Sequence, residues 1–592
     1  MRCRTARRVL LGALAVLMAG SAGTVWAGTR VFSSHDHLQE AAVLVRELGR
    51  QLRAVDPAAA RTLTRLQGET RAARADVEDP TWWAGAHLPA AGDDLAAVRT
   101  IATTLDDLAR DGLPQLVATA GLLRAGSLLP RDGRIDLTPL QRAAPQLAAA
   151  DAAMRKARGT VEAIAVDGLA APVRAAVVRL GTELGDTART VTMAAKSATL
   201  LPPMLGADGR RTYLVLFQNL AEVRATGGMP GAYVVVEADQ GKIKIADQGT
   251  ATGLAPFQRP VVDLTPADRH LYTDKLATYP ANVNLTPHFP TTGEIAREMY
   301  RRRTGVTVDG VLSTDPVALS YLLTVLGPVP VRGGAPLTAR NAVPVLLSRL
   351  YRDDISSARQ DAYFAAAARA TFRALLARPL DPRDLLDALA RAAGERRLLV
   401  WSTRAEENRL LANTVLAGVL PAGDGTEPTV GVFLNDGSGA KLGYYLTHDA
   451  EVAVTPVCRG DGRREITLRV VLGSTAPKSG LPAYVLGLGL AGDPYTVRTN
   501  VSVYSPTGGA IAGMRLDGEK RSFGSGRDRR RAVGIITVDV RPGTRRTLDV
   551  TMLTGVPAGG YGTTVTPRLW TTPGLVSWDR MIHSGDGCRN TR

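Results

Sequence analysis

The sequence is poor in the residues that build most metal centres and nucleophilic active sites. Its 592 residues include three cysteines and seven histidines, and the histidines are scattered along the chain. The sequence has no Gly-x-Ser-x-Gly elbow, no His-Glu-x-x-His motif and no phosphate loop ending in Gly-Lys-Ser/Thr. These absences argue against an α/β-hydrolase, a zinc protease and a P-loop NTPase. No cofactor is therefore predicted.

Charged residues are missing from one stretch near the amino terminus. Four arginines among the first eight residues precede Val9–Val25, where almost every residue is apolar or small. A basic segment followed by an uncharged run is typical of an export signal, and this run is close to the ~17–25 residues of a membrane span. Residues 1–30 are therefore predicted to be a cytoplasmic basic tip and signal anchor of a single-pass plasma-membrane protein, with the bulk of the chain extracytoplasmic. Val25-Trp26-Ala27 leaves a cleaved signal peptide as the alternative.

Cysteine is too scarce for a disulfide framework, but it permits one bridge. Cys458 and Cys588 both lie in the region predicted to be exported, where two cysteines most simply pair. Such a bridge would close a loop of ~130 residues and would contribute about 4–5 kcal/mol through its effect on the unfolded chain. The sequence therefore predicts a disulfide between Cys458 and Cys588.

Acidic residues are outnumbered by basic ones, and the net charge is +16. Most of the basic residues are arginines. A surface of this kind favours anionic partners such as phospholipid head groups, teichoic-acid-like polymers or pyrophosphate lipids. Nucleic acid is the other usual partner of a basic chain. It is rejected because the amino terminus predicts export and the chain carries no nucleic-acid-binding motif.

The pattern of apolar residues divides the remaining chain into three parts. Residues 31–205 are rich in alanine and carry apolar residues at three-four spacing, which predicts a helical bundle or stalk. Residues 206–418 alternate strand and helix signals, as in a layered α/β domain. Residues 419–592 contain short alternating strands between Gly/Pro turns, which predicts a β-sandwich. The predicted fold class is thus multidomain: a transmembrane helix, a helical bundle, a central α/β domain and a β-sandwich.

A polar loop between two buried strands is the best candidate for a binding site. The apolar runs Tyr213–Phe217 and Ala232–Val236 flank it, and it carries Arg224 and three glycines. Glycine permits positive φ and close approach of a ligand, and arginine suits phosphate. A solvated arginine with glycines that only shape turns is an equally good interpretation of these residues alone. The residues predicted to shape the loop are Gln218, Asn219, Glu222, Thr226, Gly227, Gly228 and Gly231.

Three segments give the chain a resemblance to a known family. QNLAEVRATGGMPGAY, HFPTTGEIAREMYRRRTGVTVDGVLSTDPVALSYLLTVLGPV and NDGSGAKLGYYL look like the hallmark blocks of domain-of-unknown-function family 4012. The family comprises anchored extracytoplasmic proteins common in high-GC Gram-positive bacteria (actinobacteria). The resemblance implies architecture and location but no activity. The chain departs from the family pattern at Leu220, where a second Asn is usual, and at His288, where Asp is expected.

The order of elements in the central part is also similar to that of the LytR-CpsA-Psr phosphotransferases. These enzymes move wall glycopolymers from a polyprenyl-pyrophosphate lipid onto peptidoglycan. Arg224-Ala-Thr226 occupies a place similar to their Arg-Ser-Asp-Thr loop, followed by a predicted helix (Thr292–Arg303), strand (Asp309–Leu312) and helix (Val317–Leu326). The segment SRLYRDDISSARQDAYF is similar to their arginine-rich helix. The phosphate-binding residues that the resemblance implies are Arg224, Arg352, Arg359 and Gln360.

Two departures weaken that second resemblance. The acid expected in the loop is Ala225 or Thr226 here, and no Pro-Arg-Asp follows the third strand. A magnesium site is therefore not supported, and no catalytic residue is assigned. Without the resemblance, Arg352 and Arg359 are better interpreted as pairing with nearby Asp residues on a solvated helix face.

Two functions follow from these observations. The first is a membrane-anchored protein of cell-envelope glycopolymer assembly that binds, or transfers from, a polyprenyl-phosphate-linked substrate. As an enzyme it would be a LytR-CpsA-Psr-like glycopolymer phosphotransferase. The alternative is a non-catalytic envelope scaffold or polymer-binding protein, which an internally paired Arg224 would favour. The expected partners are the cytoplasmic membrane and an anionic lipid-linked glycan or wall polymer, and the oligomeric state stays open.

Overall fold

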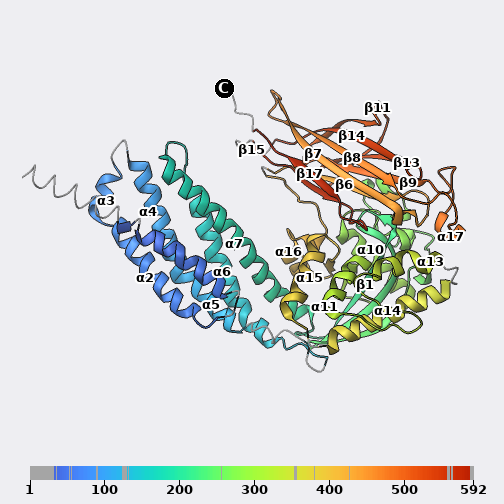
Figure 1. Cartoon of the computed structure of the whole chain (residues 1–592), viewed down its shortest axis with the longest axis horizontal. Coiled ribbons are helices and arrows are strands. Elements are labelled where there is room, and N and C mark those ends of the chain that lie inside the picture. Colours follow the sequence, from blue (N-terminus) through green and yellow to red (C-terminus); the bar gives the residue numbers. More distant parts are fainter. Residues whose placement is uncertain are drawn as a thin grey trace, which may run out of the picture. The chain divides into compact units, whose positions relative to one another are not determined.

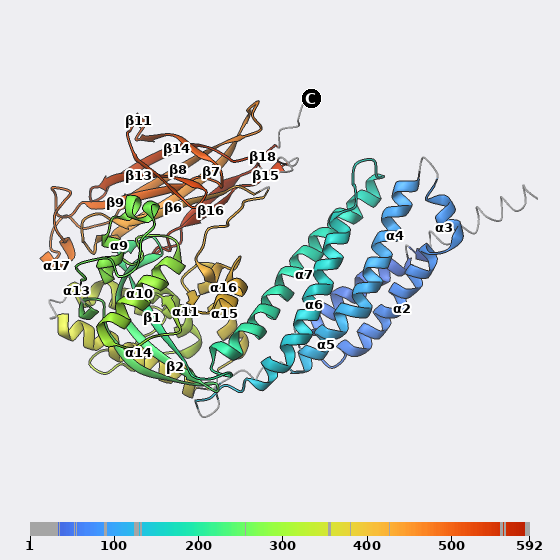
Figure 2. The ribbon, with the colours of Figure 1, turned by 180° about the vertical axis from the view of Figure 1, so that it is seen from behind.

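The chain divides into two compact units (Figures 1 and 2). One takes Met1–Leu128 and Ile135–Asp208, and the other takes Leu129–Arg134 and Gly209–Arg592. The predicted α/β and β-sandwich regions both lie in the second unit. The computed structural model describes residues 33–34, 36–52, 54, 56–87, 91–122, 130, 133–254, 256–352, 357–378, 380–425, 427–556, 561 and 564–586.

The first unit is helical. Its two longest described helices, α6 (Thr138–Glu162) and α7 (Ala171–Met204), pack along each other. Met154 and Val161 of α6 share one apolar core with Leu184 of α7. Buried alanines between such residues let the two helices approach closely, as ridges-into-grooves packing requires. The other described helices of this unit are α2 (Ala59–Val77), α3 (Pro80–Gly85), α4 (Gly92–Asp107), η1 (Leu108–Gly112) and α5 (Leu113–Leu122), with further helical residues at 36–52.

The predicted transmembrane helix is not found. None of the helices in the described ranges combines the length and the apolarity that a bilayer crossing demands. Even α7, the longest of them, carries charged residues such as Arg179 and Glu183 along its length, and charge at bilayer depth is costly. Residues 1–30, to which the anchor was assigned, lie outside the described residues. The prediction of a single-pass membrane protein is corrected accordingly.

The predicted disulfide is likewise not found. No disulfide is present in the part of the chain that the structure describes. Cys458 ends strand β7 (Leu446–Cys458), whereas Cys588 lies outside the described residues. The bridge predicted between them is therefore withdrawn.

The second unit begins with a five-stranded mixed sheet of order β3-β2-β1-β4-β5. Strand β1 (Arg211–Arg224) lies at its centre, antiparallel to β2 (Gly227–Asp239) and parallel to β4 (Gly310–Thr314). Strands β3 (Lys242–Thr250) and β5 (Leu399–Ser402) form its edges. This central position explains the continuous apolar run at the start of β1.

Helices cover this sheet and link it to the rest of the unit. On one face, α10 (Phe289–Thr304) packs Ile295 and Met299 into a core with Leu214 and Leu216 of β1. The remaining helical segments of the unit are η2 (Thr252–Leu254), α8 (Pro266–Tyr272), α9 (Lys275–Thr278), η3 (Pro280–Asn282), α11 (Pro316–Leu326), α12 (Ala342–Pro344), η4 (Val345–Arg349), α13 (Leu350–Arg352), α14 (Ser357–Ala377), α15 (Pro382–Gly394), α16 (Ala405–Leu411), η5 (Val415–Ala417), η6 (Leu442–Tyr445) and α17 (Ala483–Leu486).

The rest of the unit is a β-sandwich. A six-stranded sheet of order β11-β10-β14-β8-β7-β17 faces a five-stranded sheet of order β12-β13-β9-β6-β16. Valines from both sheets, such as Val452 and Val538, share one core, as inward-facing alternate residues do. The strands other than β7 are β6 (Thr429–Asp436), β8 (Arg464–Ser474), β9 (Val497–Tyr504), β10 (Ala510–Leu516), β11 (Glu519–Lys520), β12 (Gly524–Asp528), β13 (Arg531–Val540), β14 (Arg545–Leu553), β16 (Arg568–Thr571) and β17 (Asp579–His583), with β15 (Thr564–Val565) and β18 (Gly585–Asp586) as a separate pair.

A buried ion pair fixes the start of β1. Arg211 donates hydrogen bonds of 2.8 and 3.0 Å to the two carboxylate oxygens of Glu407 on α16. Ser402 at the end of β5 donates a further hydrogen bond to Glu407. The Arg211 side chain is 1% exposed and that of Glu407 is 6% exposed. The pair thus joins the central strand of the sheet to one of its edges.

We expect Glu407→Gln to lower the free energy of unfolding by about 3–5 kcal/mol, because it leaves a buried arginine without its anionic partner. Burial alone would raise the pKa of Glu407, but the hydrogen bonds from Arg211 and Ser402 outweigh burial and hold the pKa below its ordinary value. A lowered carboxyl pKa gives stability that is complete above the unfolded pKa of about 4.3 and is lost as the pH falls below it. Urea unfolding at about pH 7 and about pH 3.5 should show a smaller acid loss in the variant than in the wild type. An equal loss would contradict this account.

Candidate functional site

The predicted polar loop is mostly strand. Strand β1 continues through Gln218 to Arg224, and β2 resumes at Gly227, so that a turn of Ala225 and Thr226 replaces the expected loop. The pairing register between β1 and β2 shifts between Asn219 and Val223. The extra residues of β1 at this irregularity have no opposite residue on β2. Gly227 has a φ of +136°, and a Cβ on Gly228 would lie 2.1 Å from the carbonyl oxygen of Asn219. The glycines therefore permit a tight hairpin rather than the approach of a ligand.

Polar side chains of the hairpin form hydrogen bonds inside the protein, although Asn284 Oδ1 and Arg224 Nε are buried without a partner among the described residues. Gln218 accepts a hydrogen bond from the Gly228 amide at 2.9 Å and donates one to Ser313 on β4. Asn284 donates to the Gly228 carbonyl at 2.7 Å and to the Thr226 hydroxyl at 3.0 Å. All four of these polar side chains are buried. Buried polar groups need such partners, which explains why polar residues continue the strand.

The tip of the hairpin is bound to the β-sandwich. The Ala225 amide donates to Asn435 at 3.0 Å, and the Ala225 carbonyl accepts from Thr572 at 3.1 Å. Glu222 forms a buried ion pair with Lys441, which follows β6. We refer to Gln218–Gly228 with Asn435, Lys441 and Thr572 as the hairpin joint. Its contacts hold the mixed sheet and the sandwich together.

Arg224 belongs to the interior of this joint. Its side chain donates to the Val223 carbonyl at 2.9 Å and to Asn282 at 3.4 Å, and the residue is 7% exposed. Its charge also acts on Asp436 at the end of β6. Burial raises the pKa of Asp436 above its ordinary value, and the positive charge of Arg224 partly offsets that rise. Asp436 accepts hydrogen bonds from Ser438 and from the Gly439 amide, so it caps its own turn.

The other three predicted phosphate-binding residues have different environments. Arg352 ends α13 and is exposed, and Arg359 on α14 is exposed as well. Gln360 beside it is 5% exposed. The predicted set is thus divided between one internally bonded arginine and two that face solvent. This division favours the interpretation of Arg224 as a structural residue.

His288, where the family pattern leads us to expect Asp, caps a helix. It precedes α10, and its Nδ1 accepts hydrogen bonds from the Thr291 amide at 3.3 Å and from Arg529 at 2.9 Å. Burial, and then the charge of Arg529, lower the pKa of His288 to about 3. The imidazole is therefore neutral at physiological pH and serves as an acceptor. It connects α10 to the β12–β13 turn of the sandwich.

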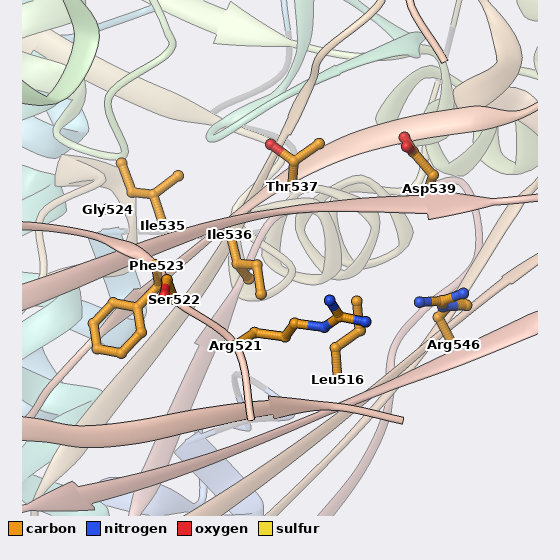
Figure 3. Close-up of a pocket in the computed structure, with 10 residues that line it drawn as sticks. All are labelled: Leu516, Arg521, Ser522, Phe523, Gly524, Ile535, Ile536, Thr537, Asp539 and Arg546. Atoms are coloured by element: carbon orange, nitrogen blue, oxygen red, sulfur yellow. The ribbon is translucent and has the colours of Figure 1, made fainter. Parts of the chain in front are cut away.

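A cleft that sequence reasoning missed lies at one edge of the sandwich (Figure 3). Strand β12 pairs with β13 only as far as Gly524 opposite Ile535. Beyond that point Ile536–Val540 are paired with β9, and the described residues place no strand on their other side. The chain from Arg521 to Phe523 crosses there from one sheet to the other, and the resulting cleft measures about 660 Å³.

The walls of this edge cleft combine apolar and polar groups. Leu516, Phe523 and Ile536 supply apolar surface. Figure 3 shows Arg521 reaching between Ile536 and Arg546, while Thr537 projects from the other side of the strand that carries Ile536. The lining residues are Leu516, Arg521, Ser522, Phe523, Gly524, Ile535, Ile536, Thr537, Asp539 and Arg546.

One charge in the edge cleft is left without a counter-ion. Arg546 is paired with Asp517 at 2.7 Å, and Asp539 is paired with Arg498 at 3.2 Å. The Arg521 guanidinium is exposed and has no ion-pair or hydrogen-bond partner among the described residues. The cleft is therefore suited to an anionic group, which an arginine fork can bind through paired hydrogen bonds. Within the same described residues, no group of three His, Cys, Asp or Glu side chains is placed to hold a metal.

If Arg224 is structural, Arg224→Ala should lower the free energy of unfolding by about 1–3 kcal/mol, because it removes the buried hydrogen bonds to Val223 and Asn282 and the positive charge that acts on Asp436. The exposed Arg352→Ala serves as the control and should change that free energy by less than about 0.5 kcal/mol. Inorganic pyrophosphate should shift the melting temperatures of wild type and Arg224→Ala equally, since a ligand stabilises only a protein that binds it. A larger shift for the wild type would restore Arg224 as a phosphate-binding residue.

The cap of α10 gives a second prediction. His288→Asp should raise the free energy of unfolding by about 0.5–1.5 kcal/mol, because a carboxylate caps the helix, suits its positive end and faces Arg529. His288→Asn keeps a cap without charge and is the matched control. Because the folded pKa of His288 is lowered, the wild type should lose stability as the pH falls below the unfolded value of about 6.5. Thermal melts of the three proteins from neutral to acidic pH measure both effects, and a pH dependence shared by His288→Asn would contradict the assignment.

Comparison with known proteins bears on the central part of the chain. No curated protein matches the chain. The resemblance to the LytR-CpsA-Psr phosphotransferases gains no support from these comparisons. The family model described as a protein of unknown function (DUF4012) matches residues 208–351, which run from before β1 to α13 and include the hairpin. The match contains the first two of the three sequence blocks, and it confirms for these residues the resemblance to the DUF4012 family that the blocks predicted.

Proposed function

We propose that this protein is a non-catalytic binding protein for an anionic glycan of the kind found in cell-envelope polymers. The proposal takes up the second of the two functions that the sequence predicts. The observation that carries it is the exposed guanidinium of Arg521, which has no partner among the described residues and stands in a cleft with both apolar and polar walls.

The chemistry of the edge cleft fits a glycan unit with an acidic substituent. Sugar rings present apolar faces, and Phe523 and Leu516 offer apolar surface against which such faces can pack. Ser522 provides a hydroxyl group for hydrogen bonds with sugar hydroxyls. Arg521 supplies the cation for a phosphate or carboxylate. A cleft of about 660 Å³ is large enough for a few sugar units.

The geometry of the hairpin joint supports binding rather than phosphotransfer. An enzyme of that type would need cations at the place where charge develops in the transition state. Arg224, the residue expected to supply one, is instead bonded to the Val223 carbonyl and to Asn282 inside the protein. Arg352 and Arg359 face solvent. We therefore assign the glycan to the sandwich and no chemical step to the central sheet.

The proposal is tested by measuring the affinity of the full chain for poly(glycerol phosphate) and for neutral dextran of similar length. We expect Arg521→Ala to weaken binding of the phosphate polymer by about tenfold, the effect of losing one charge-assisted contact. The matched control is Arg530→Ala, which removes the same charge at an exposed position in the β12–β13 turn, at the far end of β12 from the cleft. It should bind as the wild type does.

Two outcomes would contradict the proposal. One is equal affinity of the wild type for the charged and the neutral polymer. The other is an equal loss of affinity in Arg521→Ala and Arg530→Ala, which would indicate attraction by net charge rather than by the edge cleft. Both variants should keep the wild-type melting temperature, because substitutions of exposed residues of this kind change stability by less than about 0.5 kcal/mol.

A further inference from the structure

A second groove runs along the edge of the mixed sheet. One wall is the outer side of β3, from Ile243 to Gln248, and the other is α14, which packs against β3 and β2. Arg369, Phe372 and Arg373 of α14 face the groove together with Leu376. These four residues follow the spacing of one helix face. The groove measures about 990 Å³ and lies within the second unit.

The β3 side of this groove offers backbone groups for pairing. On its inner side β3 pairs with β2 from Lys242 opposite Asp239 to Thr250 opposite Ala232, with a shift of register that leaves Ala246 unpaired. On its outer side Lys242 makes a single antiparallel bridge with Arg134. The structure places no other described residue in a strand along Ile243–Thr250 on that side. An open edge of this kind is a template on which another extended segment can pair.

The groove also carries positive charge without a counter-ion. Arg369 and Arg373 have no ion-pair or hydrogen-bond partner in the described parts of the chain. Two charged residues of β3 line the groove: Lys244 is paired with Glu237 at 2.8 Å, and the Asp247 carboxylate accepts a hydrogen bond from Tyr300 at 3.0 Å. The positive charge of the groove therefore attracts an acidic segment. It also disfavours self-association of the protein through this groove, because two basic surfaces would repel each other.

We infer that this groove binds an extended acidic peptide segment of a partner protein as an added strand on β3. The peptide backbone pairs with the free side of Ile243–Gln248, as in β-strand addition. Alternate side chains of the peptide point toward α14, where their carboxylates face Arg369 and Arg373 and their methylene groups pack on Phe372 and Leu376. The inference does not rest on the proposed glycan function, because a glycan has no backbone amides to pair with a strand.

The test measures fluorescence anisotropy of a labelled peptide of alternating Glu and Val, added to the full chain, with a Lys-Val peptide as the charge control. We expect the Glu-Val peptide to bind and the Lys-Val peptide to bind at least about tenfold more weakly. Arg373→Glu should weaken Glu-Val binding by about tenfold. Arg409→Glu makes the same charge change at an exposed position on α16 and should bind as the wild type does.

Backbone pairing is tested separately from charge. Two N-methylated versions of the Glu-Val peptide are compared. Because the amides of alternate residues point to the same edge of an extended peptide, methylation of every second residue blocks one edge, and each version blocks a different edge. Methylation of the edge that faces β3 should abolish binding, whereas methylation of the other edge should leave it unchanged, because only one edge of an added strand donates to the sheet. Equal effects of the two versions would overturn the inference, as would the absence of binding to the wild type or an equal effect of Arg373→Glu and Arg409→Glu.

Discussion

The polar end of β1 is the constraint on which the second unit depends. Past Phe217 the strand carries polar side chains into the interior, where each unsatisfied group costs about 1–3 kcal/mol. The partners come from two directions: Ser313 and Asn284 belong to the α/β part, whereas Asn435 and Lys441 belong to the sandwich. Neither part satisfies the hairpin alone. The mixed sheet and the sandwich are therefore coupled in folding, although their sequence patterns differ enough to suggest separate domains.

The three sequence blocks that carry the family resemblance meet at this joint. The first forms the hairpin itself, the second supplies Ser313 on β4, and the third supplies Lys441 after β6. The first and third blocks also approach closely, since a Cβ on Gly443 would lie 2.7 Å from the carbonyl oxygen of Ala221. A shared joint explains why these residue types occur together without requiring an active site. Such blocks therefore identify a fold more directly than they identify a reaction.

Local patterns predicted the regular elements of this sheet well and its polar end poorly. The expected helix at Thr292–Arg303 lies within α10, and Asp315 caps α11 through a 2.8 Å bond from the Ala318 amide. Both features depend on residues close in sequence. The continuation of β1 through Gln218 and Glu222 does not, because their partners are 95 and 219 residues away. The edge cleft was missed for a related reason. It exists because β12 pairs with only part of β13, and the extent of that pairing depends on residues far apart in the sequence.

The burial of each arginine shows whether it has a structural role or is free to bind a ligand. A net charge of +16 suggests an anionic partner, yet several arginines are buried inside the second unit and form hydrogen bonds and ion pairs there. Arg531, 4% exposed, donates to the carbonyls of Thr429, Ser505 and Pro421 and pairs with Asp424 at 2.7 Å. The five donors of a guanidinium suit it to satisfying several loop carbonyls at once.

The arginines that have no side-chain partner among the described residues then carry more information than the total charge. Arg521 stands in the edge cleft, and Arg369 and Arg373 stand on the wall of the β3 groove. Each lies beside apolar surface, where a bound anion is shielded from water and its attraction to the guanidinium is stronger than on an open surface. A basic sequence becomes evidence for a ligand only at such positions, after the internally paired arginines have been set aside.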